Sequence, residues 1–191
     1  GLVAGCGNSD DGQNAENEGG EGGGYHFEVV VKSFQSTYWQ AAIQGIEAAE
    51  EEFGVTTNTT GPNAESDIAD QVNMLNNAIS QNPDGIALAA CDQNSVLEAL
   101  QDALDADIPV VCFDTGVPNA PEGSVIATVV TDNESAGAVA AENMYPVIKD
   151  AIANATEQVR IGEVNQDATS ANITGRGMGF INKMKELIEA D

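Results

Sequence analysis

The chain has 191 residues, 42% of them hydrophobic, which is enough to bury the core of one full domain and part of a second. Acidic residues outnumber basic residues 31 to 6, giving a formal net charge of −25. That charge repels nucleic-acid phosphates and anionic lipid headgroups, and no apolar run approaches the roughly 20 residues of a transmembrane helix. The composition argues against a nucleic-acid partner, and solubility or adaptation to salt accounts for the acidity.

The first 24 residues have the layout of a lipid anchor and a tether. Residues 2–6 read LVAGC, which resembles the end of a bacterial signal peptide with its lipobox, so we expect residues 1–6 to be a leader remnant and Cys6 to be lipidated. Residues 7–24 contain seven glycines, five acidic residues and no basic residue. Such a segment cannot bury enough apolar surface to fold, which predicts a disordered acidic tether with ends roughly 25 Å apart.

From residue 25 onward, apolar runs of strand length alternate with stripes of helical period. The predicted strands are 27–31, 53–57, 85–90, 108–113, 124–130 and 159–164. The predicted helical stripes span 39–53, 68–79, 96–104, 140–148 and 181–188. This alternation predicts an α/β fold, a parallel sheet with flanking helices. The runs IALAA and IPVVCF are apolar on both faces, as buried parallel strands are.

Ligands bind parallel sheets at the carboxyl ends of the strands, so the loops that follow the predicted strands are the candidate site. These loops are rich in Asp, Asn, Gln, Ser and Thr, and they span 32–39, 90–94, 114–117, 131–133 and 165–170. None carries GxGxxG or GxxxxGK[ST], so no nucleotide cofactor is expected. The chain has no GxSxG elbow, and His26 has no partner at metal-ligand spacing, so neither an enzyme nor a metal site is expected.

Cys91 and Cys112 each end an apolar run. Buried free thiols are the default for such positions. If the two runs are neighbouring strands, a disulfide between them is also geometrically possible, and the sequence does not decide between these alternatives.

The order of the polar motifs resembles that of the type I periplasmic sugar-binding proteins, the ribose- and galactose-binding group that serves ABC transporters. The resemblance covers about residues 26–190 and rests on five segments: KSFQSTYWQAAIQGIEAA, NPDGIALAACDQNSV, IPVVCFDTGVP, VVTDNESAGAVAAE and DATSANITGRGMGF. It implies a two-lobed fold, with a first lobe over 25–132, a hinge near 131–133 and the start of a second lobe over 133–191. Family members continue through further βα units, so the resemblance implies an N-terminal fragment.

The resemblance also implies a set of sugar-binding residues. Tyr38 and Trp39 match the aromatic pair that stacks on a sugar ring, although Trp39 also fits the core stripe of the first helix. Asp114 matches the carboxylate that accepts hydrogen bonds from two hydroxyls, and Arg176 matches the arginine of the second lobe. The remaining implied contacts are Ser36, Asp92 and Thr115.

Two departures from the family pattern bear on the ligand. Thr115 stands where ribose binders have arginine, and Ala89 or Ala90 stands where they have asparagine. These departures point away from ribose and leave the sugar class in place. The expected function is that of an extracytoplasmic lipoprotein that captures a monosaccharide or small polyol for the permease subunits of an ABC importer. It would touch the membrane only through its lipid. The alternative is the same module acting as a ligand sensor for a chemoreceptor or histidine kinase.

Overall fold

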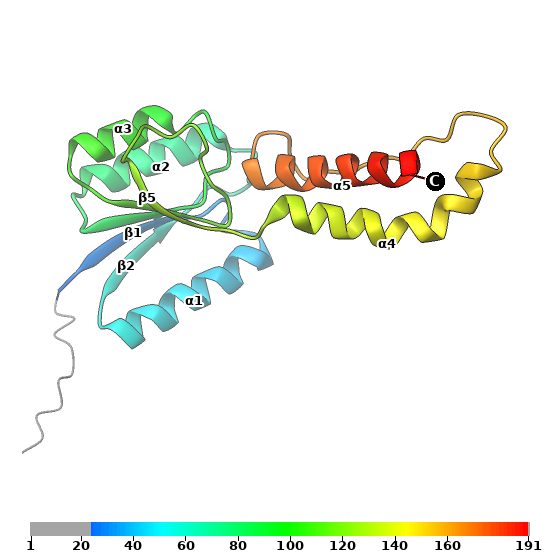
Figure 1. Cartoon of the computed structure of the whole chain (residues 1–191). Helices are drawn as coiled ribbons and strands as arrows, with labels where there is room; N and C mark the ends of the chain where they lie inside the picture. The colour runs from blue at the N-terminus through cyan, green and yellow to red at the C-terminus, as the bar shows by residue number, and fades with distance from the viewer. Residues whose placement is uncertain (1–23, 191) are drawn as a thin grey trace, which may run out of the picture.

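The computed structural model describes residues 24–190. The predicted leader 1–6, the lipidation site Cys6 and all but the last residue of the predicted tether lie outside the described residues. Five strands form one sheet in the order β2-β1-β3-β4-β5, and every neighbouring pair is parallel (Figure 1). The predicted α/β fold class is confirmed.

The centre of the sheet is more apolar and more buried than its two edges. The central strands are β1 (His26–Val30), β3 (Gly85–Leu88) and β4 (Val110–Phe113), and most of their residues are buried. The edge strands are β2 (Thr56–Thr60), with the sequence TTNTT, and β5 (Val125–Val129), which is mostly exposed. Central parallel strands are covered on both faces, which is why the centre is the more apolar part.

Helices cover both faces of this sheet. Helix α1 (Thr37–Phe53) lies on one face, whereas α2 (Ile68–Ser80) and α3 (Leu97–Asp105) lie on the other (Figure 1). The larger apolar cluster forms beneath α2 and α3, and a smaller one around Trp39 forms beneath α1. Helix α1 ends at Gly54, whose φ of +64° is the left-handed conformation that glycine adopts without strain.

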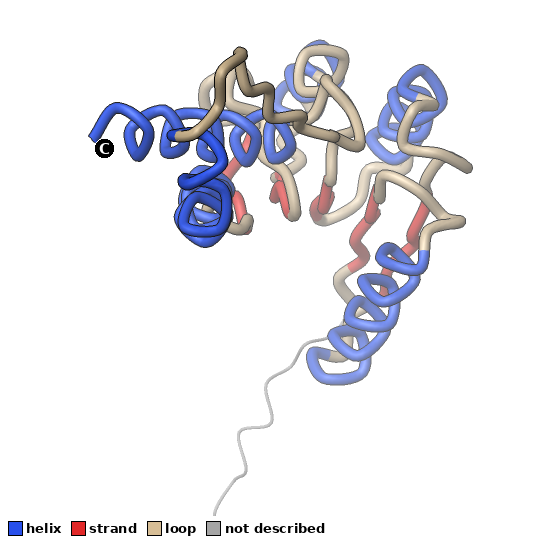
Figure 2. The backbone as a smooth tube through the Cα atoms, turned by 90° about the vertical axis from the view of Figure 1, so that its right-hand side faces the viewer, coloured by secondary structure: helices blue, strands red, loops and turns tan. Residues whose placement is uncertain are grey.

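The last two helices form a separate pair beside the sheet. Helices α4 (Asn133–Ala153) and α5 (Ala171–Ala190) both begin near the sheet and extend away from it, side by side (Figures 1 and 2). Their own apolar cluster centres on Ala141, Tyr145 and Met184. None of the helices within residues 24–190 is long and apolar enough to cross a membrane.

Two strand predictions are wrong. The predicted strand 53–57 is displaced, because α1 continues through Phe53 and the β2 strand begins at Thr56. Threonine is a strong strand former, and the polar TTNTT run pairs with β1 as an edge strand. The predicted strand 159–164 does not form: no strand among the described residues lies beside it, and Val164 is 98% exposed. A strand needs a neighbour for its backbone hydrogen bonds.

The two cysteines of the described chain are free thiols. Both are buried, and burial raises the pKa of Cys91 to about 12 and that of Cys112 to about 11. At neutral pH both therefore stay protonated, which suits packing rather than reactivity.

Candidate functional site

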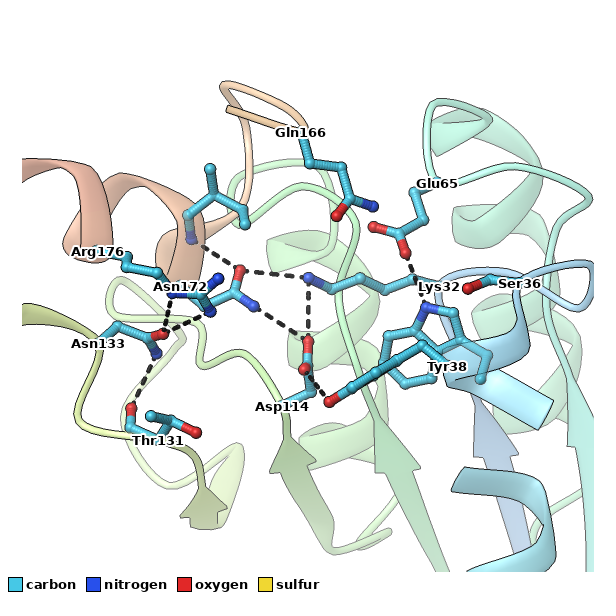
Figure 3. Close-up of a pocket in the computed structure, with 12 residues that line it drawn as sticks. Lys32, Ser36, Tyr38, Glu65, Asp114, Thr131, Asn133, Gln166, Asn172 and Arg176 are labelled. Carbon is cyan, nitrogen blue, oxygen red and sulfur yellow. Dashed lines mark hydrogen bonds and ion pairs between the residues drawn. The ribbon is translucent and has the colours of Figure 1, made fainter. Parts of the chain in front are cut away.

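A polar cavity of about 370 Å³ opens at the carboxyl ends of the strands, between the sheet and the start of the α4–α5 pair (Figure 3). It lies at the end of the sheet where the strand-end rule places ligands. Both parts of the chain contribute to it. The lining residues are Lys32, Ser36, Tyr38, Trp39, Glu65, Asp114, Thr131, Asn133, Gln166, Asn172, Ile173 and Arg176.

The two aromatic residues of the first helix point in different directions. Trp39 is 1% exposed and packs in the cluster beneath α1, and it is also one of the residues that line the cavity. Tyr38 is 60% exposed and meets Trp39 edge-on, with ring centroids 5.0 Å apart. Helix α1 thus anchors one ring in the core and presents the other at the mouth of the cavity.

Each aromatic residue donates a hydrogen bond to one carboxylate. The Trp39 indole Nε1 donates to Glu65 Oε1 at 2.8 Å, and the Tyr38 hydroxyl donates to Asp114 Oδ1 at 2.8 Å. The hydrogen bond to Asp114 raises the pKa of Tyr38 to about 12, with burial adding to the effect. These bonds fix both rings before any ligand arrives.

Asp114 is the partly buried centre of a polar cluster that links the two parts of the chain. Its Oδ2 lies 3.2 Å from Lys32 Nζ and accepts a hydrogen bond of 3.2 Å from Asn172 Nδ2. Lys32 Nζ also donates to Asn172 Oδ1 at 3.4 Å. Asp114 has a φ of +63°, an uncommon conformation that aspartate tolerates better than most residues and that turns the chain directly after β4.

Breaking the Lys32–Asp114 pair would lower the stability of the folded protein. Lys32 is 2% exposed, and Asp114 is the acidic group paired with its ammonium in the described chain. Removing one partner of a buried ion pair leaves an uncompensated charge, which typically costs about 3–5 kcal/mol. Asp114 is therefore a counterion as well as a cavity residue.

Arg176 reaches the cavity from α5 through close packing of the two last helices. A Cβ added at Gly137 would meet the backbone oxygen of Arg176, and one added at Gly179 would meet the backbone of Glu134. Glycine at both positions lets the start of α4 touch the second and third turns of α5. The Arg176 guanidinium donates from Nε (3.2 Å) and Nη2 (2.8 Å) to Asn133 Oδ1, at the start of α4.

The structure brings five of the seven sequence-predicted contacts to this cavity: Ser36, Tyr38, Trp39, Asp114 and Arg176. The other two are not among its lining residues. Asp92 Oδ1 accepts hydrogen bonds from the backbone of Asn94 and from the backbone and hydroxyl of Ser95, so it organises the turn before α3. Burial opposes the ionisation of Asp92, but these hydrogen bonds outweigh it and lower its pKa. Thr115 is 1% exposed, and its Oγ1 accepts from the backbone of Asn172.

Sequence reasoning marked Thr131 and Asn133 only as part of a loop and hinge, and it did not single out four other polar residues of the cavity. Lys32 and Gln166 lie in strand-end loops that the pattern marked as a whole. Asn172 comes two residues after such a loop, and its place at the start of α5 was the available signal. Glu65 was not predicted because the strand expected over 53–57 forms at Thr56–Thr60 instead. Glu65 lies in the loop after this later strand, and that loop was not among the predicted strand-end loops.

The charges of the cavity wall balance. Lys32 and Arg176, two of only six basic residues in the chain, face Glu65 and Asp114. Within residues 24–190, no group of three or more His, Cys, Asp or Glu is arranged to hold a metal ion. A balanced wall of donors and acceptors beside aromatic rings suits an uncharged, hydroxyl-rich molecule, because neither an anion nor a cation would find a surplus of opposite charge.

Comparison with known proteins agrees with this geometry. The periplasmic binding protein domain matches residues 27–190. The ABC transporter periplasmic-binding protein YphF of Escherichia coli K12 is 24% identical over 156 residues, which are 79% of this chain and 45% of that protein. The chain spans about half the length of the relatives it matches.

Several solved structures of ABC transporter proteins are also similar to this chain. An ABC transporter solute-binding protein of Agrobacterium vitis with bound D-fucose is 34% identical, with a TM-score of 0.76 over 84% of this chain and 53% of the other. An ABC transporter, LacI family transcriptional regulator from Brachyspira murdochii is 35% identical, with a TM-score of 0.77 over 87% and 53%. A carbohydrate transporter solute-binding protein of Agrobacterium radiobacter in complex with D-arabinose is 25% identical, with a TM-score of 0.71 over 84% and 52%. The chain belongs to the periplasmic binding protein domain family.

Proposed function

We propose that this protein captures an uncharged monosaccharide or a similar small polyol outside the cytoplasm for an ABC importer. The observation that carries this proposal is the charge-balanced polar cavity at the strand ends, with Tyr38 at its mouth and Trp39 in its wall. Family membership supports it, as do the D-fucose and D-arabinose bound to similar proteins.

The chemistry of a sugar fits the groups on the wall. The C–H faces of a sugar ring pack on aromatic faces, and its hydroxyls need hydrogen-bond partners once they leave water. Ser36, Tyr38, Trp39, Asp114 and Arg176 supply these contacts in our proposal. Asp92 and Thr115 act indirectly in our proposal, the first by shaping the turn before α3 and the second by holding the backbone of Asn172.

Ligand capture in our proposal uses two lobes, residues 25–132 and 133–191, joined by a hinge at 131–133. The cavity is lined from both sides of that hinge, which supports closure of the lobes around the sugar. The loop that leads into α5 already contacts the sheet side, since Thr169 Oγ1 donates to the Cys91 carbonyl at 3.0 Å and Gln93 N donates to the Thr169 carbonyl at 3.3 Å.

Delivery would place the protein at a membrane. We propose that residues 1–6 are the remnant of a signal peptide, that Cys6 carries the lipid and that residues 7–24 are the tether. The bilayer contact is then through the lipid anchor alone, and the protein partners are the permease subunits of the importer. The role is binding without chemistry on the sugar, as for the solute-binding family to which the chain belongs.

A thermal-shift screen tests this function. The purified protein is heated with D-fucose, D-arabinose, D-galactose and D-tagatose, and with two controls that carry ionised groups, the zwitterion L-leucine and the anion inorganic phosphate. A sugar at a hundredfold excess over its Kd should stabilise the protein by about 2.7 kcal/mol, and the controls should not. No shift with any sugar, or a shift with a charged solute alone, would contradict the proposed function.

A further inference from the structure

Some polar groups of the cavity use their hydrogen-bond positions on one another, and others keep donor or acceptor positions that no protein group uses. A carboxylate offers about four acceptor positions. Three positions on Asp114 are already taken, by Tyr38, Lys32 and Asn172 (Figure 3). A sugar hydroxyl that seeks Asp114 therefore meets a nearly saturated acceptor, and two hydroxyls would have to displace a protein donor.

Glu65 is the other carboxylate of the cavity, and its acceptor positions are mostly open. Its Oε1 accepts from Trp39 Nε1 at 2.8 Å, whereas its Oε2 has no hydrogen-bond or ion-pair partner among residues 24–190. The residue is partly buried, and its side chain points into the cavity from the loop between β2 and α2 (Figure 3).

The indole contact gives Glu65 a defined position. Trp39 is itself locked in the core, so its N–H holds one carboxylate oxygen and leaves the second directed at the space where a ligand would lie. Across the cavity, the Arg176 donors that do not reach Asn133 are open as well. A sugar between these two residues would donate to one side and accept from the other.

We propose that Glu65 is the specificity-determining carboxylate of the site: its Oε2 accepts a hydrogen bond from a ligand hydroxyl, while Asp114 neutralises Lys32 and offers the ligand only its one remaining acceptor position. This inference rests on the proposed function and makes it more specific. The ligand must present a hydroxyl donor beside the edge of Trp39.

The isosteric variant Glu65→Gln separates recognition from positioning. Glutamine keeps an oxygen that can accept from Trp39 Nε1, but it replaces the open acceptor with an amide donor. The probe is D-fucose, or the panel sugar that binds best, and the measurement is isothermal titration calorimetry. We expect Glu65→Gln to weaken binding by about tenfold or more, since hydrogen bonds to charged groups are worth that much. Glu47→Gln, an exposed position on α1 outside the cavity, removes the same charge and should leave the affinity unchanged.

Deoxy sugars provide a second measurement that does not depend on one variant. Among the monodeoxy analogues of the sugar, the one that lacks the hydroxyl donor to Glu65 should bind wild type and Glu65→Gln about equally, as in a double-mutant cycle. Wild-type affinity in Glu65→Gln for the intact sugar would overturn this inference and leave the proposed function standing. Absence of binding by the wild type would overturn the proposed function and this inference with it.

Discussion

The sheet region and the helical pair differ in how completely each is packed. The sheet has helices on both faces and a continuous core, whereas α4 and α5 share one small cluster, and Val147 and Val164 are 81% and 98% exposed. Both regions show the same alternation of apolar runs and helical stripes in the sequence. The difference teaches that two helical stripes can pack on each other, whereas an apolar run becomes a strand only where a neighbouring strand is available.

The two regions meet at the cavity. The sheet side supplies the aromatic rings and both carboxylates, and the helical pair supplies Arg176, Asn133 and Asn172. The buried cluster of Lys32, Asp114 and Asn172 is the joint between them. Substitutions in the sheet region, in the joint and in the helical pair should therefore have distinct effects.

The largest effect is expected in the sheet region. Trp39→Ala removes a large side chain that is 1% exposed, and such truncations cost about 3–5 kcal/mol of unfolding free energy. The adjacent Tyr38→Ala changes a residue that is 60% exposed and should cost much less. Urea unfolding of the two variants measures the difference. Equal destabilisation by both would show that Trp39 is not the core anchor.

The second-largest loss of stability is expected at the joint between the two regions. Asp114→Asn leaves the buried ammonium of Lys32 without its counterion and should destabilise the protein by about 3 kcal/mol. Adding Lys32→Met removes the stranded charge, so the double variant should regain much of that loss. A double-mutant cycle of unfolding free energies from urea denaturation measures this coupling. Strictly additive effects would mean that the two side chains do not depend on each other.

A smaller effect is expected where the two last helices touch. Gly137→Ala puts a methyl group against the backbone of Arg176 and should cost about 1–3 kcal/mol. The matched control is Gly45→Ala in α1, where an added Cβ meets nothing within 4 Å, and a stabilisation of about 0.5–1 kcal/mol is expected. Hydrogen exchange should show the Gly137→Ala effect in α4 and α5 first. Faster exchange throughout the sheet would contradict the separation of the two regions.

The smallest effect is a pH dependence at the mouth of the cavity. The hydrogen bond to Asp114 raises the pKa of Tyr38 to about 12, above the usual value of about 10 for an unfolded tyrosine. The folded state then holds the proton more tightly, so the stability from this contact is present below pH 10 and is lost as pH rises from 10 to 12. Tyrosinate absorbance should show a late step that Tyr38→Phe removes. A titration that Tyr38→Phe leaves unaltered would count against the Tyr38–Asp114 bond.

The sequence predicted the fold class well because periodicity and strand-end rules are local. It marked the loops that carry Tyr38, Trp39 and Asp114 to one edge of the sheet. It missed the roles of Lys32 and Asn172 because their importance comes from partners 82 and 58 positions from them, at Asp114. No local pattern reports which distant group neutralises a buried charge.

The most direct test of the account is calorimetric titration of D-fucose, or the best sugar of the screen, into wild type and Arg176→Gln. Arg176 stands on the helical pair, so the comparison asks whether both regions hold the same ligand. We predict saturable binding by wild type and about tenfold weaker binding by Arg176→Gln, since one charge-assisted donor is lost. Equal affinity of the two proteins would contradict a shared site, and a wild type that binds no sugar would contradict the proposed function.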